Sequence, residues 1–92
     1  MEHLRLLNSP AWAAIVKGLI RSQMSLHQIT YQVLSERLGQ QFGCQQSAFN
    51  LKSKVNKGVL GAQLFLQIML ALDADTVDLK QILHLWQQKS DK

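Results

Sequence analysis

The chain has 92 residues, of which 47% are apolar and 17% charged, and its formal net charge is +4. A chain of this length forms one domain. The composition excludes a disordered protein and, since no apolar run reaches the ~20 residues that a bilayer requires, a membrane-spanning one. We expect a cytoplasmic domain over residues 1–92, with an N-terminal arm at 1–8, a core at 9–88 and a tail at 89–92.

The apolar residues recur at intervals of three and four, which predicts an all-α fold, a compact bundle of about five short helices. The first helix is expected at about 10–22, because Ser9 can act as its N-cap and Pro10 suits the first helical position. A stripe of apolar residues predicts the side on which this helix packs. The stripe consists of Trp12, Ile15, Val16, Leu19 and Ile20.

The second helix is expected to begin at Ser25, whose hydroxyl can cap the backbone while Gln28 reaches back, an arrangement called a capping box. Gly39 is expected to end it. The polar segment at 39–46 is predicted to be a loop, with the ring of Phe42 under the core. The core-facing residues of the second helix would be Leu26, Ile29, Val33, Leu34 and Leu38.

The three remaining helices have clear signals at their ends. Ser47 and Gly58 are expected to cap the third helix at its two ends. After Gly61, the run "AQLFLQIMLAL" predicts a helix that is apolar on nearly every side and buried in the middle of the bundle. Asp78 is the expected N-cap of a last helix. The predicted apolar side of that helix consists of Leu79, Ile82, Leu83 and Trp86.

The third helix carries an unusual surface pattern. From Arg37 to Leu72 the chain has four basic residues and no acid, and a positive field of this kind favours polyanions. If Ala48, Leu51 and Val55 face the core, a rotation of ~100° per residue turns amide, hydroxyl and ammonium groups outward. Asn and Gln can pair with adenine, and Lys can reach guanine or phosphate. The predicted DNA-binding residues are Gln46, Ser47, Asn50, Lys52, Ser53, Lys54 and Lys57.

The segment "SLHQITYQV", a polar connection and then "SAFNLKSKVNKGVLGAQLFLQIMLALDAD" are similar to the lambda-repressor-like, Cro-type helix-turn-helix domain. In Cro-type domains a tight turn joins the second and third helices, and the connection at 39–46 is expected to be about one turn of helix longer. From about Trp12 to Leu79 the chain resembles more closely a family of small uncharacterised bacterial domains. The matching residues are Trp12, Leu19, Leu26, Ile29, Leu38, Asn50, Leu51, Lys54, Val55, Gly58, Leu66, Gln67, Ile68 and Leu72.

The resemblance implies a DNA-binding transcriptional regulator of bacterial or phage type, with the helix at about 47–57 in the major groove of double-stranded DNA. We expect a homodimer, because one unit contacts only a half-site. The alternative is a helical protein-interaction module, an antirepressor, adaptor or inhibitor, that does not bind DNA. Apolar residues at both ends of the chain could form a dimer or partner contact, unless the arm packs back onto the last helix. These residues are Leu4, Leu7, Leu85 and Trp86.

No pattern in the sequence is typical of catalysis or metal binding. Cys44 is the single cysteine, so it cannot form an internal disulfide, and no nucleophile has a base at a suitable spacing. The three histidines, His3, His27 and His84, lie on different predicted elements. We therefore expect no enzyme activity, no metal and no cofactor. Trp12 and Trp86 are expected in the core and not as stacking platforms.

Overall fold

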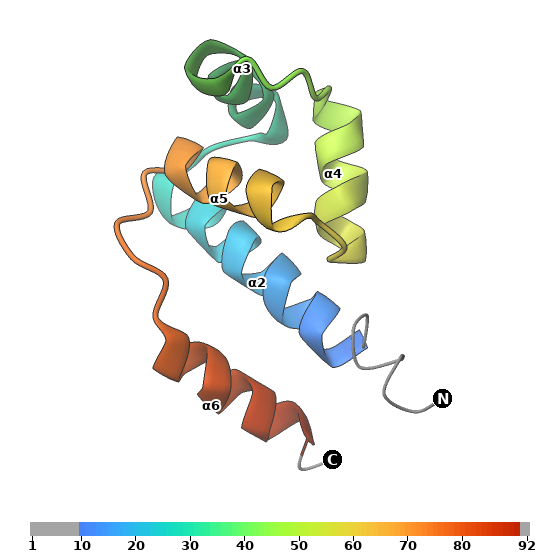
Figure 1. Cartoon of the computed structure of the whole chain (residues 1–92), viewed down its shortest axis with the longest axis vertical. Coiled ribbons are helices and arrows are strands. Elements are labelled where there is room, and N and C mark those ends of the chain that lie inside the picture. The colour runs from blue at the N-terminus through green and yellow to red at the C-terminus, as the bar shows by residue number, and fades with distance from the viewer. Residues whose placement is uncertain (1–9, 91–92) are drawn as a thin grey trace.

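The structure is a computed structural model that describes residues 10–90, and the described part consists of five α-helices and their connections (Figure 1). The all-α prediction is confirmed, since no strand occurs in this part of the chain. In Figure 1, α5 lies across α2, with α4 on one side of α2 and α6 on the other. The helices are α2 (Pro10–His27), α3 (Tyr31–Phe42), α4 (Ala48–Lys57), α5 (Ala62–Ala71) and α6 (Leu79–Ser90).

The core lies where α2, α3, α4 and α5 meet, and each of these helices or its end supplies fully buried side chains. By contrast, none of the side chains described in α6 is buried, and this helix packs mainly on α2. The helices α2 to α5 therefore form the core, and α6 is a peripheral layer. The fully buried side chains are Ile20, Leu34, Leu38, Leu51, Val55, Ile68 and Leu72.

The first helix is longer than predicted. α2 continues to His27 instead of ending near residue 22, and Ser25 lies in its last turn. The predicted capping box is therefore wrong: Gln28 has a left-handed φ of 56° and its backbone N–H bonds the carbonyl of Ser25 at 3.2 Å, so it closes the end of α2 and does not begin α3. No glycine or proline lies between Arg21 and His27, so the helix propagates past Ser25. As a result Leu26 belongs to α2 and is 71% exposed, not core-facing.

α3 also has different ends from those predicted. Its N-cap is Thr30, whose hydroxyl accepts a hydrogen bond from the backbone N–H of Val33 at 3.2 Å. The helix continues through Gly39 to Phe42, and Gly43, whose φ is 65°, is its C-cap. A glycine inside a helix costs only about 1 kcal/mol relative to alanine, which does not suffice to end it. Val33, expected to face the core, is at the surface.

α3 ends later in the chain than predicted, so its connection to α4 is shorter than predicted. This connection comprises residues 43–47 and not 39–46, so most of the predicted extra turn of helix is part of α3 itself. Phe42, expected under the core, ends the helix with its ring 39% exposed. Cys44 follows, half-buried against the core, and its backbone N–H bonds the carbonyl of Leu38 at 3.1 Å.

The burial of α5 on nearly every side is another prediction that the structure contradicts. Ile68 and Met69 are buried, but Leu66 and Leu70 remain 57% and 58% exposed. Because these two leucines are one turn apart, they lie on the same face of the helix. α5 is thus central to the core on one side and apolar toward solvent on the other.

α6 begins as predicted. The carboxylate of Asp78 accepts hydrogen bonds from the backbone N–H groups of Lys80 and Gln81, at 3.0 and 3.2 Å, which confirms the N-cap. α2 covers only part of the apolar face of α6, because Leu79 and Leu83 on that face point to solvent. Within the described residues, no helix is both long enough and apolar enough to cross a bilayer.

Candidate nucleic-acid interface

α4 is capped at both ends by the predicted residues. The hydroxyl of Ser47 accepts a hydrogen bond from the backbone N–H of Asn50 at 3.0 Å. At the other end Gly58 has a φ of 67°, and its N–H bonds two carbonyls of the last turn at 3.0 and 2.9 Å. Leu51 and Val55 are fully buried as predicted. These two anchors determine which side of α4 faces outward.

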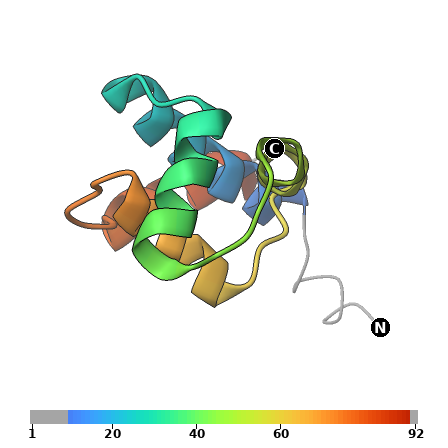
Figure 2. The ribbon, with the colours of Figure 1, turned by 90° about the horizontal axis from the view of Figure 1, so that it is seen from above.

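Close backbone contact holds the end of α4 against α2. A Cβ on Gly58 would lie 2.2 Å from the carbonyl oxygen of Ala13 and 2.6 Å from its Cα, so no side chain fits there. At the start of α4, the hydroxyl of Ser35 in α3 donates a hydrogen bond to the carbonyl of Gln46. Figure 2, seen from above, shows α4 nearly end-on at one edge of the bundle. These contacts with α2 and α3 hold α4 in place and so fix the direction in which its outward side points.

The predicted DNA-binding residues lie on or beside this outward side. Only Gln46 and Ser53 are half-buried, and Ser53 is a short side chain flanked by larger residues one turn away on either side. The hydroxyl of Ser47 is an acceptor in the cap and keeps its hydrogen for a donor role. α4 carries no carboxylate. The residues that are solvent-exposed are Ser47, Asn50, Lys52, Lys54 and Lys57.

Arg37, the fourth cation of the acid-free segment, does not belong to this surface. Its guanidinium Nη1 donates a hydrogen bond to the carbonyl oxygen of Ala71, the last residue of α5, at 2.9 Å. Cations near the last carbonyls of a helix are stabilising. Arg37 therefore has a structural role, and the positive charge of the outward side comes from lysines of α4.

Phe49 belongs to the outward side of α4 but is absent from the predicted interface. Its ring is 79% exposed, more than any other large apolar side chain of the described chain. At ~100° per residue, Phe49 lies about 40° from the direction opposite the buried residues Leu51 and Val55, and Asn50 lies about 60° from it on the other side. The helical projection that identified Asn50 could have found it.

The residues predicted for a dimer or partner contact are not brought together. Leu4 and Leu7 lie outside the described residues, as does the predicted cap Ser9. Leu85 and Trp86 are half-buried on the side of α6 that faces α2. The rings of Trp12 and Trp86 meet edge-on, with centroids 6.0 Å apart. Trp12 is still 37% exposed, so the two rings join α2 to α6 at the surface and not in the core.

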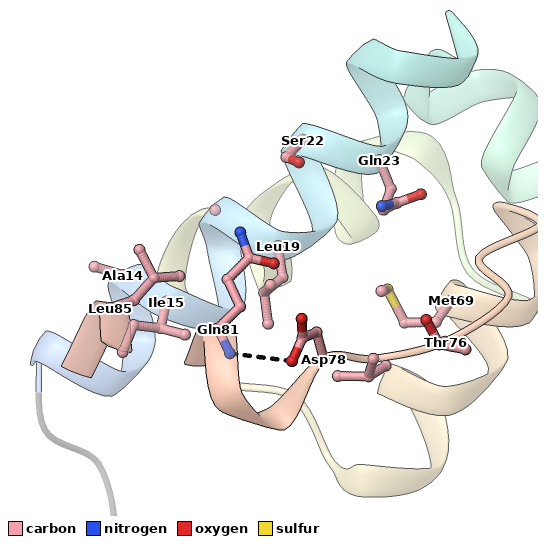
Figure 3. Close-up of a pocket in the computed structure, with 12 residues that line it drawn as sticks. Ala14, Ile15, Leu19, Ser22, Gln23, Met69, Thr76, Asp78, Gln81 and Leu85 are labelled. Atoms are coloured by element: carbon pink, nitrogen blue, oxygen red, sulfur yellow. Dashed lines mark hydrogen bonds between the residues drawn. The ribbon is translucent and has the colours of Figure 1, made fainter. Parts of the chain in front are cut away.

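A separate cavity of about 480 Å³ lies between α2, α6 and the segment that precedes α6 (Figure 3). Asp78 is the charged residue among those lining it. Its carboxylate is already engaged as the cap of α6, including the bond to Gln81 drawn in Figure 3. The cavity thus offers amides and hydroxyls beside an apolar wall. No group of three metal-ligating side chains occurs in the part of the chain described. Other lining residues are Ile15, Leu19, Ser22, Gln23, Met69, Thr76 and Leu85.

The structure defines a small all-α domain in which α4, capped at both ends, turns amide, hydroxyl and ammonium groups to solvent. The family described as domain of unknown function DUF6471 matches residues 12–77, and the chain belongs to this family. The resemblance to a family of small uncharacterised domains is thereby confirmed over nearly the expected range. The matched span includes α2 nearly whole and all of α3, α4 and α5, but ends before α6. No curated protein and no solved structure matches the chain significantly.

Proposed function

We propose that this protein binds double-stranded DNA through α4 and acts as a transcriptional regulator of bacterial or phage type. The observation that carries the proposal is the composition of the outward side of α4. There, lysines and Asn50 face solvent on a helix that has no carboxylate. Phosphate attracts lysine, and amide side chains can read base edges.

The placement of these residues along α4 supports docking in the major groove. That groove is ~12 Å wide and admits an α-helix, whose N-terminal residues contact base edges in helix-turn-helix proteins. Asn50 lies in the first turn of α4, whereas Lys54 and Lys57 lie in the last turn. The short connection at 43–47 also supports the proposal, since it leaves the α3–α4 pair nearer to a Cro-type arrangement than the sequence predicts.

The alternative explanation for the lysines is local. Lys54 and Lys57 lie in the last turn of α4, where cations stabilise a helix through its dipole. The same reasoning favours acids in the first turn, and Glu–Lys pairs one turn apart would add further stability. α4 has neither feature. The helix dipole therefore accounts for Lys54 and Lys57, but it does not account for Lys52 or Asn50, which are also exposed on α4.

The test is a titration of the full chain against duplex DNA at two salt concentrations. Lys57→Ala should weaken binding to all duplexes alike and reduce the slope of log K against log salt by about one unit. Asn50→Ala should cost about 1–3 kcal/mol on a preferred sequence and little on random DNA. Lys80→Ala is the matched control, because Lys80 is exposed on α6, across α2 from α4. No affinity for duplex at about 50 mM salt would overturn the proposal.

A second candidate function is supported by the exposed leucines. Two helices each expose a pair of leucines that are one turn apart. The pairs are Leu66 and Leu70 on α5, and Leu79 and Leu83 on α6. Such surfaces are typical of sites for protein partners. This function would replace the first if two results are obtained together. The chain has no affinity for duplex DNA, and a host protein is captured by the Lys54→Glu/Lys57→Glu variant but not by the Leu66→Glu/Leu70→Glu variant.

A further inference from the structure

We propose that Phe49 and Asn50 together read A·T base pairs, with the ring of Phe49 on the methyl group of thymine and the amide of Asn50 on adenine. The inference rests on the proposed DNA binding by α4 and adds the base composition of the preferred site. It also gives a role to an exposed aromatic ring that the stability of the fold does not require.

The exposure of Phe49 is the first observation behind the inference. The other large apolar residues of α4, Leu51 and Val55, are fully buried, whereas the ring of Phe49 is 79% exposed. Leaving a phenyl ring in water forgoes the gain that its burial would give. Neighbouring segments of the described chain leave most of this ring uncovered. The exposed ring of Phe49 is therefore available to contact an apolar group of a binding partner.

The second observation is the position of the two residues. Phe49 and Asn50 are consecutive in the first turn of α4, the end of a recognition helix that meets base edges. Their Cα atoms are ~3.8 Å apart, close to the ~3.4 Å rise between base pairs. Phe49 and Asn50 can therefore contact either the same base pair or two adjacent base pairs.

The third observation concerns the amide of Asn50. Its backbone N–H is satisfied by the hydroxyl of Ser47 at 3.0 Å. Within the described chain its side-chain amide forms no hydrogen bond, so both the donor and the acceptor remain for adenine N7 and N6. A bidentate amide therefore lies beside the exposed ring.

The chemistry of the major groove identifies the partner of the ring. Among the four bases, thymine alone presents a methyl group there, next to its O4 acceptor. Cytosine instead presents an amino group, which would lose its water against a phenyl ring without gaining a hydrogen bond. An apolar ring beside a bidentate amide is thus complementary to A·T pairs and unfavourable for G·C pairs.

The test begins with selection of a preferred duplex from a randomised pool by the full chain. Each thymine of that duplex is then replaced singly by deoxyuridine, which removes only the C5 methyl group. At one or two positions the loss should weaken binding about threefold to tenfold, as expected for one buried methyl group. Phe49→Ala should bind the thymine and deoxyuridine duplexes equally well. Because this side chain is exposed, the variant should retain the helical circular dichroism of the wild type.

Phe42→Ala is the matched control, since Phe42 is also a surface phenylalanine but ends α3, and it should keep the sensitivity to deoxyuridine. Absence of duplex binding would overturn both this inference and the proposed function. Duplex binding with a normal salt dependence but no effect of deoxyuridine, or an effect that persists in Phe49→Ala, would overturn the inference alone. Tighter binding to single strands than to duplex, lost in Phe49→Ala, would also overturn it, because the ring would then stack on bases.

Discussion

Gly58 shows how one residue determines the position of the proposed interface. Its φ of 67° is a left-handed conformation that costs an L-residue about 1–2 kcal/mol. In addition, a Cβ at this position would lie 2.2 Å from the carbonyl oxygen of Ala13 in α2. We therefore expect Gly58→Ala to lower the free energy of unfolding by about 2–5 kcal/mol, from conformation and overpacking together. Urea unfolding followed by circular dichroism measures this loss.

Gly43 provides the control for this substitution. Its φ of 65° is nearly the same, but a Cβ there would have no atom within 4 Å. Gly43→Ala should therefore cost only the conformational part, about 1–2 kcal/mol. The difference between the two variants isolates the contact between α4 and α2. Equal losses would show that this contact can relax and does not fix the position of α4.

At the scale of the elements, Arg37 joins α3 to α5. The hydrogen bond from its guanidinium to the carbonyl of Ala71 is 2.9 Å long and partly buried. Hydrogen bonds to charged groups contribute about 1.5–3 kcal/mol, so Arg37→Met should lower the free energy of unfolding by about this amount. Because Arg37 is not on the outward side of α4, the salt dependence of DNA binding should not change. Thermal melts and a salt titration measure the two effects.

Lys52→Met is the comparison for Arg37→Met, since Lys52 is an exposed cation of α4. It should leave the melting temperature nearly unchanged, and any effect should be on DNA affinity. A reduced salt slope in Arg37→Met would contradict the structural role of this residue. It would mean that the guanidinium leaves Ala71 and contacts phosphate in the complex.

The elements that could be predicted from the sequence are those whose ends depend on local bonds. Ser47 and Asp78 cap the backbone two or three residues ahead, and both were predictable from their positions before apolar runs. The junction of α2 and α3 was not, because Ser25 and Thr30 compete as caps and the choice depends on tertiary packing. Met24 and Ile29, on either side of this junction, are both buried in the core.

The candidate site was predictable to a similar extent. A helical projection places Asn50 and the lysines of α4 outward, because it requires only that Leu51 and Val55 face the core. The role of Arg37 depends on Ala71, which is 34 residues away in the sequence, so no local pattern reveals it. Phe49 differs again: the same projection places it outward, but an aromatic residue is by default expected in the core, so the sequence prediction omitted it although its ring is 79% exposed.

On the scale of the whole molecule, α6 differs from the rest of the domain. It lies outside the matched span of residues 12–77 and packs on the side of α2 that is opposite to α4 (Figure 1). Its face toward α2 is half-buried, while Leu79 and Leu83 are 73% and 56% exposed. A second copy of the chain that covers these leucines would leave both α4 helices accessible. We therefore expect a homodimer in which α6 supplies the contact.

Sedimentation equilibrium at tens of micromolar should give twice the mass of the chain. Leu79→Glu/Leu83→Glu should give a monomer with unchanged helicity, because charges would then have to be buried without partners in the interface. Leu66→Glu/Leu70→Glu, a pair of equally apolar residues on α5, should remain dimeric. A monomeric wild type would contradict the prediction, and dissociation by the α5 pair instead would move the interface to α5. Since a dimer contacts two half-sites about one helical turn apart, the monomeric variant should lose affinity for a duplex with both half-sites while it binds a single half-site as the wild-type subunit does.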